Sequence, residues 1–241
     1  MGEWEDRAQR ATERRERMNS FGPHACGLLV QTKYGLFAVD PEDASVTDSL
    51  LKEGVYSEGE LELASSLISP QSEVLVVGTH IGALAVPLSK RCYRMDVIEA
   101  NPKTQKLLET NLLLNYCSNV NLHRMAASDK RETINFLINR DNSGGSKRQP
   151  IEEKIYYTYD NPEIVKVNAY PLDEILGEKI YDLIFMDIEG SEYFALKGMQ
   201  HLLSKAKALD IEFFPHHLKE VAGIGPGEFA DQIVPHFEWM Y

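Results

Sequence analysis

The sequence predicts an α/β protein with a doubly wound, mostly parallel, Rossmann-like sheet. Residues 73–77, 93–98 and 183–186 are short apolar runs, as expected for strands that are buried on both faces. Helical patterns at 83–90 and 103–115 alternate with these runs, and such alternation favours a parallel sheet. Each run ends in glycine or acidic residues, which is typical of the sheet edge where ligands bind.

The segment after the run 183–186 is the most informative part of the chain. Asp187 and Glu189 flank one backbone position, and Gly190 allows a sharp turn or the close approach of a ligand. A buried charge needs a partner, and ligands of parallel sheets bind beyond the carboxyl ends of the strands. These carboxylates therefore predict a site of chemistry. Glu212, on an expected strand at 208–214, could complete an acidic cluster there.

A second segment predicts a nucleotide site. Strand 73–77 leads into a turn from Gly78 to Gly82 and then into a helix, so that the backbone can approach a ligand and the first helical turn offers free N–H groups. Glu99 closes the next strand about 20 residues later, where an acidic side chain accepts ribose hydroxyls. The spacing Gly-x-x-x-Gly is not the dinucleotide fingerprint, so the turn indicates a site only together with Glu99. Ser128-Asp129 ends the third strand, where adenine would lie, although a simple turn explains it equally well.

The remaining elements follow from periodicity and turn residues. We expect residues 1–69 to form an N-terminal helix, a β-hairpin and a helical cap, and residues 70–241 to form the main domain. Helix 4–18 is expected to be a solvated helix, although Trp4 could anchor a lid or an oligomer contact. The expected elements outside the three runs are helix 4–18, hairpin strands 28–31 and 36–39, helices 46–52 and 58–68, strands 121–127 and 133–138, loop 141–150, strand or flap 155–159, strand 165–169, helix 193–203, strand 208–214, helix 227–236 and a strand from 237.

Composition excludes several classes of protein. The 241 residues are 43% hydrophobic and 26% charged, which suits a globular domain. A net charge of −12 argues against nucleic-acid partners and an anionic membrane surface, and no apolar run is long enough to span a bilayer. Three widely spaced cysteines predict neither disulfides nor a zinc site, and the polar N-terminus does not look like a secretory signal. We therefore expect a cytoplasmic protein.

The ordered motifs resemble those of FkbM-type methyltransferases, a branch of the class I fold that uses S-adenosylmethionine. The resemblance spans about residues 30–214, and the segment 187–192 is its most specific part. It rests on Tyr34 to Phe37, Asp40, Gly54 to Glu60, Val77 to Gly82, Ile98 to Pro102, Asn111-Leu112, Asn115, Ala126 to Asp129, Asn142 to Ser146, Tyr170 to Glu174 and Asp187 to Glu192. A chain of this class normally ends in an antiparallel strand pair, so we expect a short C-terminal end here.

The resemblance implies S-adenosylmethionine as the cofactor and assigns residues to it and to the acceptor. Val76 and His80 stand where the family usually has Asp and Asn, near the methionine part of the cofactor, so that His80 or Glu60 could supply the amino-group contact. The cofactor set is Glu60, Gly78, Thr79, His80, Gly82, Glu99, Ala100, Asn101, Ala127, Ser128 and Asp187. The acceptor set is Tyr56, Asn142, Ser143, Glu189 and Glu212.

Asp187, Glu189 and His80 are the candidate catalytic groups. Methyl transfer to a hydroxyl needs a base for the hydroxyl proton, and a nearby carboxylate also stabilises a cationic sulfonium. A histidine near a helix N-terminus has a lowered pKa, so it is neutral and able to accept a proton. Asp187, Glu189 and Glu212 could instead hold a hard cation through oxygen ligands, but no dedicated ligand loop is visible and we expect no metal.

The sequence thus predicts an S-adenosylmethionine-dependent O-methyltransferase that acts on a hydroxyl of a sugar or secondary metabolite. Its partners are expected to be this small acceptor and, if helix 4–18 forms a contact, a second copy of the chain. The alternative is a non-catalytic binding or assembly module with a methyltransferase-like fold, which Val76, His80 and the short C-terminal end motivate.

Overall fold

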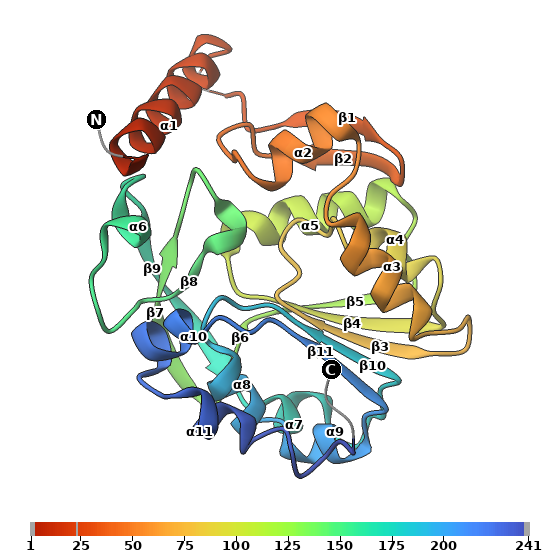
Figure 1. The fold of residues 1–241 in the computed structure, drawn as a ribbon. Helices are drawn as coiled ribbons and strands as arrows, with labels where there is room; N and C mark the ends of the chain where they lie inside the picture. The colour runs from red at the N-terminus through yellow and green to blue at the C-terminus, as the bar shows by residue number, and fades with distance from the viewer. Residues whose placement is uncertain (1–2, 23, 239–241) are drawn as a thin grey trace.

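The fold of the computed structural model, which describes residues 3–22 and 24–238, is built around a central sheet of parallel strands (Figure 1). The strand order is β11-β10-β3-β4-β5, so the chain moves outward in one direction from β3 and then in the other. The prediction of a doubly wound α/β fold is confirmed. The strands are β3 (Glu73–Val77), β4 (Arg94–Glu99), β5 (Val120–Arg124), β10 (Leu183–Met186) and β11 (Ala208–Ile211).

Alternate side chains of each central strand enter two different hydrophobic layers. Val74 and Val76 of β3 pack on one face, whereas Leu75 and Val77 pack on the other, as the two-residue period of a strand requires. The first layer lies under α4 (Ala85–Ser89) and α5 (Pro102–Leu114), above the sheet in Figure 1. The second lies over α7 (Leu172–Leu176), α8 (Glu192–Lys197) and α9 (Gln200–Lys205).

A smaller sheet lies beside the central one, and part of one strand that we expected in the central sheet belongs to it. The strand predicted at 121–127 divides at Met125, so that β5 stays in the central sheet while the next two residues join the smaller sheet. This sheet has the order β6-β9-β7-β8. Its strands are β6 (Ala126–Ala127), β7 (Glu132–Ile138), β8 (Lys147–Arg148) and β9 (Glu163–Tyr170). The loop expected at 141–150 therefore contains β8, together with η1 (Ser143–Gly145).

The N-terminal hairpin is fixed to α5 by two asparagine side chains. Asn111 accepts a hydrogen bond from Ala38 N and donates to Ala38 O and Ile81 O, and Asn115 bonds the backbone of Leu36 in the same way. The hairpin and the cap helices share the hydrophobic core of the central sheet. Whether residues 1–69 form a separate unit stays a prediction. The elements are β1 (Leu28–Thr32), β2 (Gly35–Val39), α2 (Val46–Glu53) and α3 (Glu58–Ser66).

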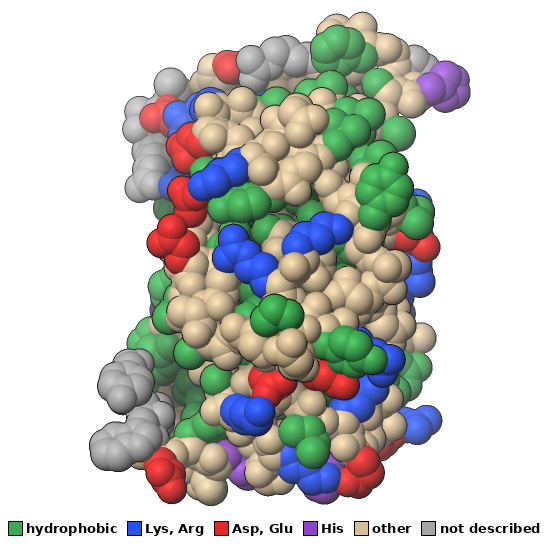
Figure 2. Space-filling view, turned by 90° about the vertical axis from the view of Figure 1, so that its right-hand side faces the viewer, with side chains coloured by type: hydrophobic (Ala, Val, Ile, Leu, Met, Phe, Trp, Pro, Cys, Tyr) green, Lys and Arg blue, Asp and Glu red, His purple; other side chains and the backbone are tan. Residues whose placement is uncertain are grey.

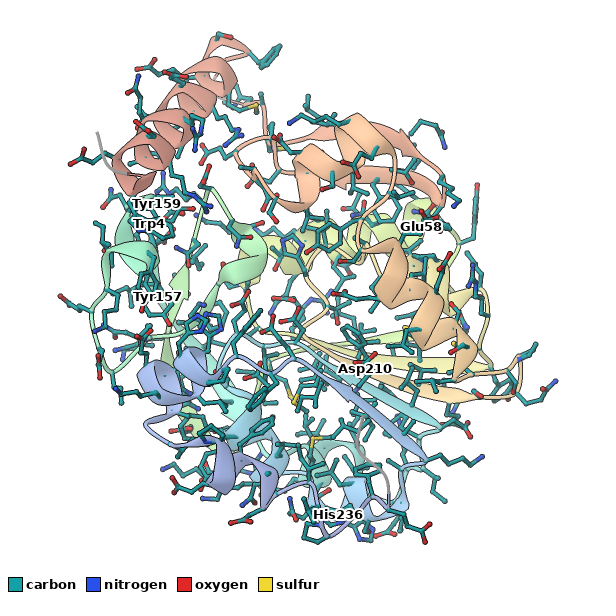
Figure 3. The ribbon with its side chains drawn as sticks, in the orientation of Figure 1. Trp4, Glu58, Tyr157, Tyr159, Asp210 and His236 are labelled. Carbon is teal, nitrogen blue, oxygen red and sulfur yellow. The ribbon has the colours of Figure 1, made fainter. Side chains whose placement is uncertain are left out.

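Helix α1 (Glu3–Ser20) lies along one side of the molecule and touches it through aromatic and charged side chains. Trp4 packs against Tyr159 with ring centroids 5.4 Å apart, and the two labels lie together in Figure 3. Arg14 forms ion pairs with Asp48 and Asp141. The segment expected as a strand or flap at 155–159 is instead a short helix, α6 (Ile155–Thr158), because its tyrosines pack toward α1 and Glu220 rather than along a sheet edge.

Several other boundaries differ from the expectation. The helix predicted at 193–203 is divided because the Asp173 carboxylate accepts His201 N and Leu202 N and so begins a second helix, α9. The strand from 208 ends at Ile211, and the helix from 227 is short. Phe237 and Glu238 are not in a strand, and the rest of the strand expected from 237 lies outside the described residues. The remaining elements are α10 (Pro215–His217), the π-helical turn η2 (Leu218–Ala222) and α11 (Pro226–Ala230).

The surface gives no sign of a basic binding face in the view of Figure 2. Lys and Arg side chains there are interspersed with acidic and apolar ones. None of the helices that the structure describes is long and apolar enough to cross a bilayer.

Replacing Asn111 tests how the hairpin is held. Because Asn111→Ala leaves Ala38 N, Ala38 O and Ile81 O without their partner inside the protein, we expect the free energy of unfolding to fall by about 3 kcal/mol. Urea denaturation measures this change. Thr110→Ala, one residue earlier on the exposed side of α5, is the control and should change stability by less than about 1 kcal/mol. Equal stabilities of the two variants would contradict this role of Asn111.

Candidate active site

A cavity of about 230 Å³ opens at the carboxyl ends of β3, β4 and β10. Its place agrees with the general rule for ligands of open parallel sheets. Most of the residues that the sequence singled out line it. They are Tyr56, Glu60, Gly78, Thr79, His80, Glu99, Ala100, Ala127, Asn142, Ser143, Asp187, Glu189 and Glu212.

Three of the proposed cofactor residues do not line the cavity. Gly82 has a φ of +88° and faces the Leu108 side chain, so it allows the turn to pack closely on α5. Asn101 caps α5 by accepting Lys103 N. Ser128 is buried, donates to Glu132 and accepts from Arg148. These contacts are structural, and a cofactor role for the three residues stays a prediction.

The glycine turn brings two strand ends into direct contact. Gly78 has a φ of +89°, and a Cβ built on it would lie 1.7 Å from the carbonyl oxygen of Asp187. Asp187 N in turn donates to Val77 O at 2.9 Å. Only glycine fits at position 78, because the positive φ disfavours any side chain and because the Asp187 carbonyl leaves no space for a Cβ. The turn therefore places the expected nucleotide side of the cavity next to its acidic side.

Glu99 is a buried carboxylate, 6% exposed, at the end of β4. It accepts His80 N at 2.6 Å, Asn101 N at 2.7 Å and the Thr104 hydroxyl at 3.0 Å. Burial raises the pKa of Glu99 to about 7, and the hydrogen bonds from Asn101 and His80 oppose this shift. These donors hold the carboxyl group in one orientation at the cavity wall, where it can accept further hydrogen bonds from hydroxyl groups.

Beyond Ala100, the cavity wall is apolar. Ile98, Met125, Ala126, Ile134 and Phe136 line it together with the predicted residue Ala127. A flat, weakly polar group such as a purine ring can be buried against such a surface. Sequence reasoning found Ala127 but missed the side chains from β7, because their strand lies in the second sheet.

Four carboxyl groups lie on the opposite side, and each is balanced differently. Glu192, which is almost fully buried, accepts Ile188 N and Gly190 N. Glu189, held at a φ of +57°, pairs with Lys147 at 2.9 Å. Burial and the neighbouring carboxylates raise the pKa of both Asp187 and Glu212, which share a hydrogen bond. Such a bond needs one proton, which belongs to the pair of carboxyl groups.

Lys147 is a site residue that the sequence did not reveal. It is 4% exposed, and its Nζ also lies 3.4 Å from His217 Nε2 and 4.8 Å from the centre of the Tyr157 ring. Burial and the Lys147 charge lower the pKa of His217 to about 3, so this histidine is neutral. The sequence neighbours of Lys147 are the glycines, serines and basic residues of an expected loop. Such a segment resembles a solvated loop and does not indicate a buried ion pair.

Tyr56 lines the cavity close to these acids. Burial and the charges of Asp187 and Glu60 raise the pKa of the Tyr56 phenol to about 12. The phenol is therefore protonated at neutral pH and can donate a hydrogen bond to a ligand oxygen.

Two groups of side chains could hold a metal ion by their geometry. Ligand atoms of Glu189, Glu212 and His217 lie within 4.8 Å of one another, as do those of Asp187, Glu192 and Glu212. In each group, however, one member is already engaged, since Glu189 pairs with Lys147 and Glu192 accepts two backbone N–H groups. The expectation of a metal-free site stays a prediction.

Comparison with known proteins identifies the family. A family model, the methyltransferase FkbM domain, matches residues 77–236. None of the curated proteins matches the sequence significantly. Among solved structures, the FkbM methyltransferase of Methylobacillus flagellatus is 20% identical, with a TM-score of 0.48 over 70% of this chain and 38% of its own length.

Two further solved structures are more distant in sequence or extent. A precorrin-6y C5,15-methyltransferase of Geobacter metallireducens is 11% identical, with a TM-score of 0.45 over 78% of this chain and 75% of its own. TYW2 of M. jannaschii, in complex with AdoMet, is 22% identical, with a TM-score of 0.33 over 41% of this chain and 42% of its own. The family assignment rests on the family model, which covers the glycine turn, Glu99 and the acidic cluster. The chain belongs to the FkbM methyltransferase family.

Proposed function

We propose that this protein is an S-adenosylmethionine-dependent O-methyltransferase that acts on a hydroxyl of a small molecule, a sugar or a secondary metabolite. The observation that carries the proposal is the arrangement of one cavity between the Glu99 carboxyl and the Asp187–Glu212 pair. Glu99 suits ribose hydroxyls, and the pair suits a sulfonium charge and a hydroxyl proton.

The cofactor would supply a methyl group on a positively charged sulfur. Glu99 would accept the ribose hydroxyls, and the wall that includes Ala127 and Phe136 would cover the adenine. These contacts align the acceptor oxygen with the methyl carbon, and alignment of reacting groups is a large source of rate.

We favour Asp187 as the base among the cavity carboxyl groups Asp187, Glu189 and Glu212. Glu189 is already paired with Lys147, and in this proposal the proton of the Asp187–Glu212 pair lies on Glu212. Asp187 Oδ1 is buried and has no hydrogen-bond partner among the described residues. The acceptor hydroxyl would give its proton to Asp187 while its oxygen forms the bond to the methyl carbon, and the carbon–sulfur electron pair would return to sulfur. The sulfonium charge would favour ionised Asp187 before transfer.

The direct test is calorimetric titration of S-adenosylmethionine and S-adenosylhomocysteine into the purified protein, followed by transfer of labelled methyl to a panel of sugars and hydroxylated secondary metabolites. We expect micromolar binding and labelled ether products. A folded sample that binds neither compound would contradict cofactor use and favour the non-catalytic module. Transfer only to amines or thiols would contradict the hydroxyl acceptor.

Replacing Glu99 tests the ribose site. Because two charged hydrogen bonds to ribose are lost, Glu99→Ala should weaken S-adenosylhomocysteine binding by about a hundredfold or more in the same titration. Glu109→Ala is the control. Glu109 is an exposed residue of α5 that pairs with Arg124, so its replacement should leave the affinity unchanged. An unaltered affinity of Glu99→Ala, with the fold intact by circular dichroism, would remove Glu99 from the site.

The raised carboxyl pKa values predict how stability changes with pH. A carboxyl whose pKa is raised by folding binds more protons in the folded state, so stability is lost as the pH rises from the unfolded value of about 4 through the folded value. That value is about 7 for Glu99 and Glu192, and Asp187 and Glu212 are also raised. The ligand-free protein should therefore lose stability between pH 5 and pH 8.

Glu212→Gln should reduce this loss, because the amide stays neutral and can donate to Asp187. We expect the decline of unfolding free energy between pH 5 and pH 8 to become smaller by about 2 kcal/mol, as measured by urea denaturation at several pH values. Glu109→Gln is the exposed control and should follow the wild-type curve. Parallel curves for Glu212→Gln and wild type would show that Glu212 does not hold the proton.

A further inference from the structure

A chain of hydrogen bonds joins three segments that are distant in sequence. Asp43 Oδ2 accepts both the backbone N–H of Ser143, at 2.8 Å, and its hydroxyl, at 2.6 Å. The Ser143 hydroxyl oxygen lies 2.7 Å from His80 Nε2. Asp43 precedes α2, Ser143 begins η1 and His80 belongs to the glycine turn, so the three residues connect the cap, the loop over the cavity and the expected cofactor turn.

The donors in this chain can be assigned from chemistry. A carboxylate only accepts hydrogen bonds, so the Ser143 hydroxyl hydrogen points to Asp43. The same hydroxyl oxygen can then only accept from the histidine, and His80 Nε2 must carry the ring hydrogen. Asp43 is 1% exposed, and its Oδ1 accepts Ser45 N and Thr47 N, so it cannot rotate away without losing both bonds.

This assignment leaves His80 Nδ1 as a bare acceptor. Nδ1 is buried and has no hydrogen-bond partner among the described residues. Burial lowers the pKa of His80, in agreement with a neutral ring. The backbone of His80 is also fixed, with a φ of +52° and its N–H bonded to Glu99. The His80 residue is thus fixed at its backbone N–H and at its Nε2, while its Nδ1 has no donor. A buried acceptor of this kind indicates a hydrogen-bond donor on a bound ligand.

The position of His80 indicates which part of a ligand that donor belongs to. The residue lies between Glu99, the expected ribose site, and Ser143 on the loop over the cavity. Val76, which also lines this region, offers no polar side-chain atom. Beyond the ribose, S-adenosylmethionine carries an amino acid whose ammonium group needs acceptors. A neutral ring with a free Nδ1 can bind it, whereas a protonated ring would repel it.

We propose that Asp43 and Ser143 are positioning residues that hold His80 with Nδ1 unprotonated, so that Nδ1 accepts an N–H of the cofactor's ammonium group. This inference rests on the proposed use of S-adenosylmethionine. It moves His80 from the candidate bases to the cofactor site, and it gives Asp43 and Ser143 a role that depends on the histidine rather than on direct contact with the cofactor.

The tautomer can be measured without any ligand. In ¹⁵N-labelled protein at pH 7, the two ring nitrogens of each histidine differ in chemical shift according to which one carries hydrogen. The His80 signals are identified as those lost in His80→Phe. We expect a hydrogen on Nε2 and none on Nδ1 in the wild type, and loss of this preference in Ser143→Ala. A ring protonated on Nδ1 in the wild type would overturn the proposal.

The role of Nδ1 is tested by two ligands that differ only in the amino acid part. We expect Ser143→Ala and His80→Phe to weaken S-adenosylhomocysteine binding by about tenfold and to leave the affinity for 5′-methylthioadenosine, which has no ammonium group, unchanged. Ser66→Ala is the control, since Ser66 is exposed on α3, lies outside the cavity lining and bonds Leu63 O instead of His80.

Each outcome decides one question. A loss of affinity for S-adenosylhomocysteine alone supports the proposal. An equal loss for both ligands, as general damage to the cavity would cause, overturns it, and so does unchanged binding of both. Failure of the wild type to bind either ligand contradicts the proposed function itself, whereas normal wild-type binding with unaffected variants contradicts only the role of His80.

Discussion

The contact between the Gly78 turn and the end of β10 is the constraint on which the rest of the site depends. With the Asp187 carbonyl oxygen 1.7 Å from where a Cβ would be, even an alanine would separate the two strand ends. The contact places the turn, Glu99 and Asp187 at one cavity although they lie far apart in the sequence. The proposed nucleotide side of the cavity and its acidic side can therefore face one ligand.

Three of the four carboxyl groups on the acidic surface are balanced, each in a different way. Glu192 is balanced by backbone N–H groups, Glu189 by Lys147, and Glu212 by the proton of the hydrogen bond that it shares with Asp187. Asp187 is the least compensated of the four, because its Oδ1 has no hydrogen-bond partner among the described residues. A cationic cofactor would supply the missing charge, so the local electrostatics favour the ligand and leave one carboxylate able to react.

The N-terminal segment lines part of the cavity, and it also supports the site through buried polar residues. Asn111 of α5 connects Ala38 of the hairpin with Ile81 of the glycine turn, and Asp43 connects the cap with Ser143. Buried networks of this kind are costly when incomplete, since each lost partner leaves an unsatisfied group. The conformation of the glycine turn therefore depends on segments that precede the sheet.

The sequence by itself determined β3, β4 and β10 of the central sheet, the glycine turn and the placement of Glu99 and Asp187 at strand ends, because these follow from local periodicity and from the steric freedom of glycine. It gave the wrong ends for the strands expected at 121–127 and 208–214. It did not reveal Lys147 or Asp43, and it placed a strand or flap where α6 forms. Lys147 belongs to an edge strand of the second sheet, and Asp43 to a turn before α2. Their burial, and the state of the protons on Glu212 and His80, depend on charges and donors from distant segments. Only the tertiary structure decides these, because a pKa or a tautomer is set by neighbours in space.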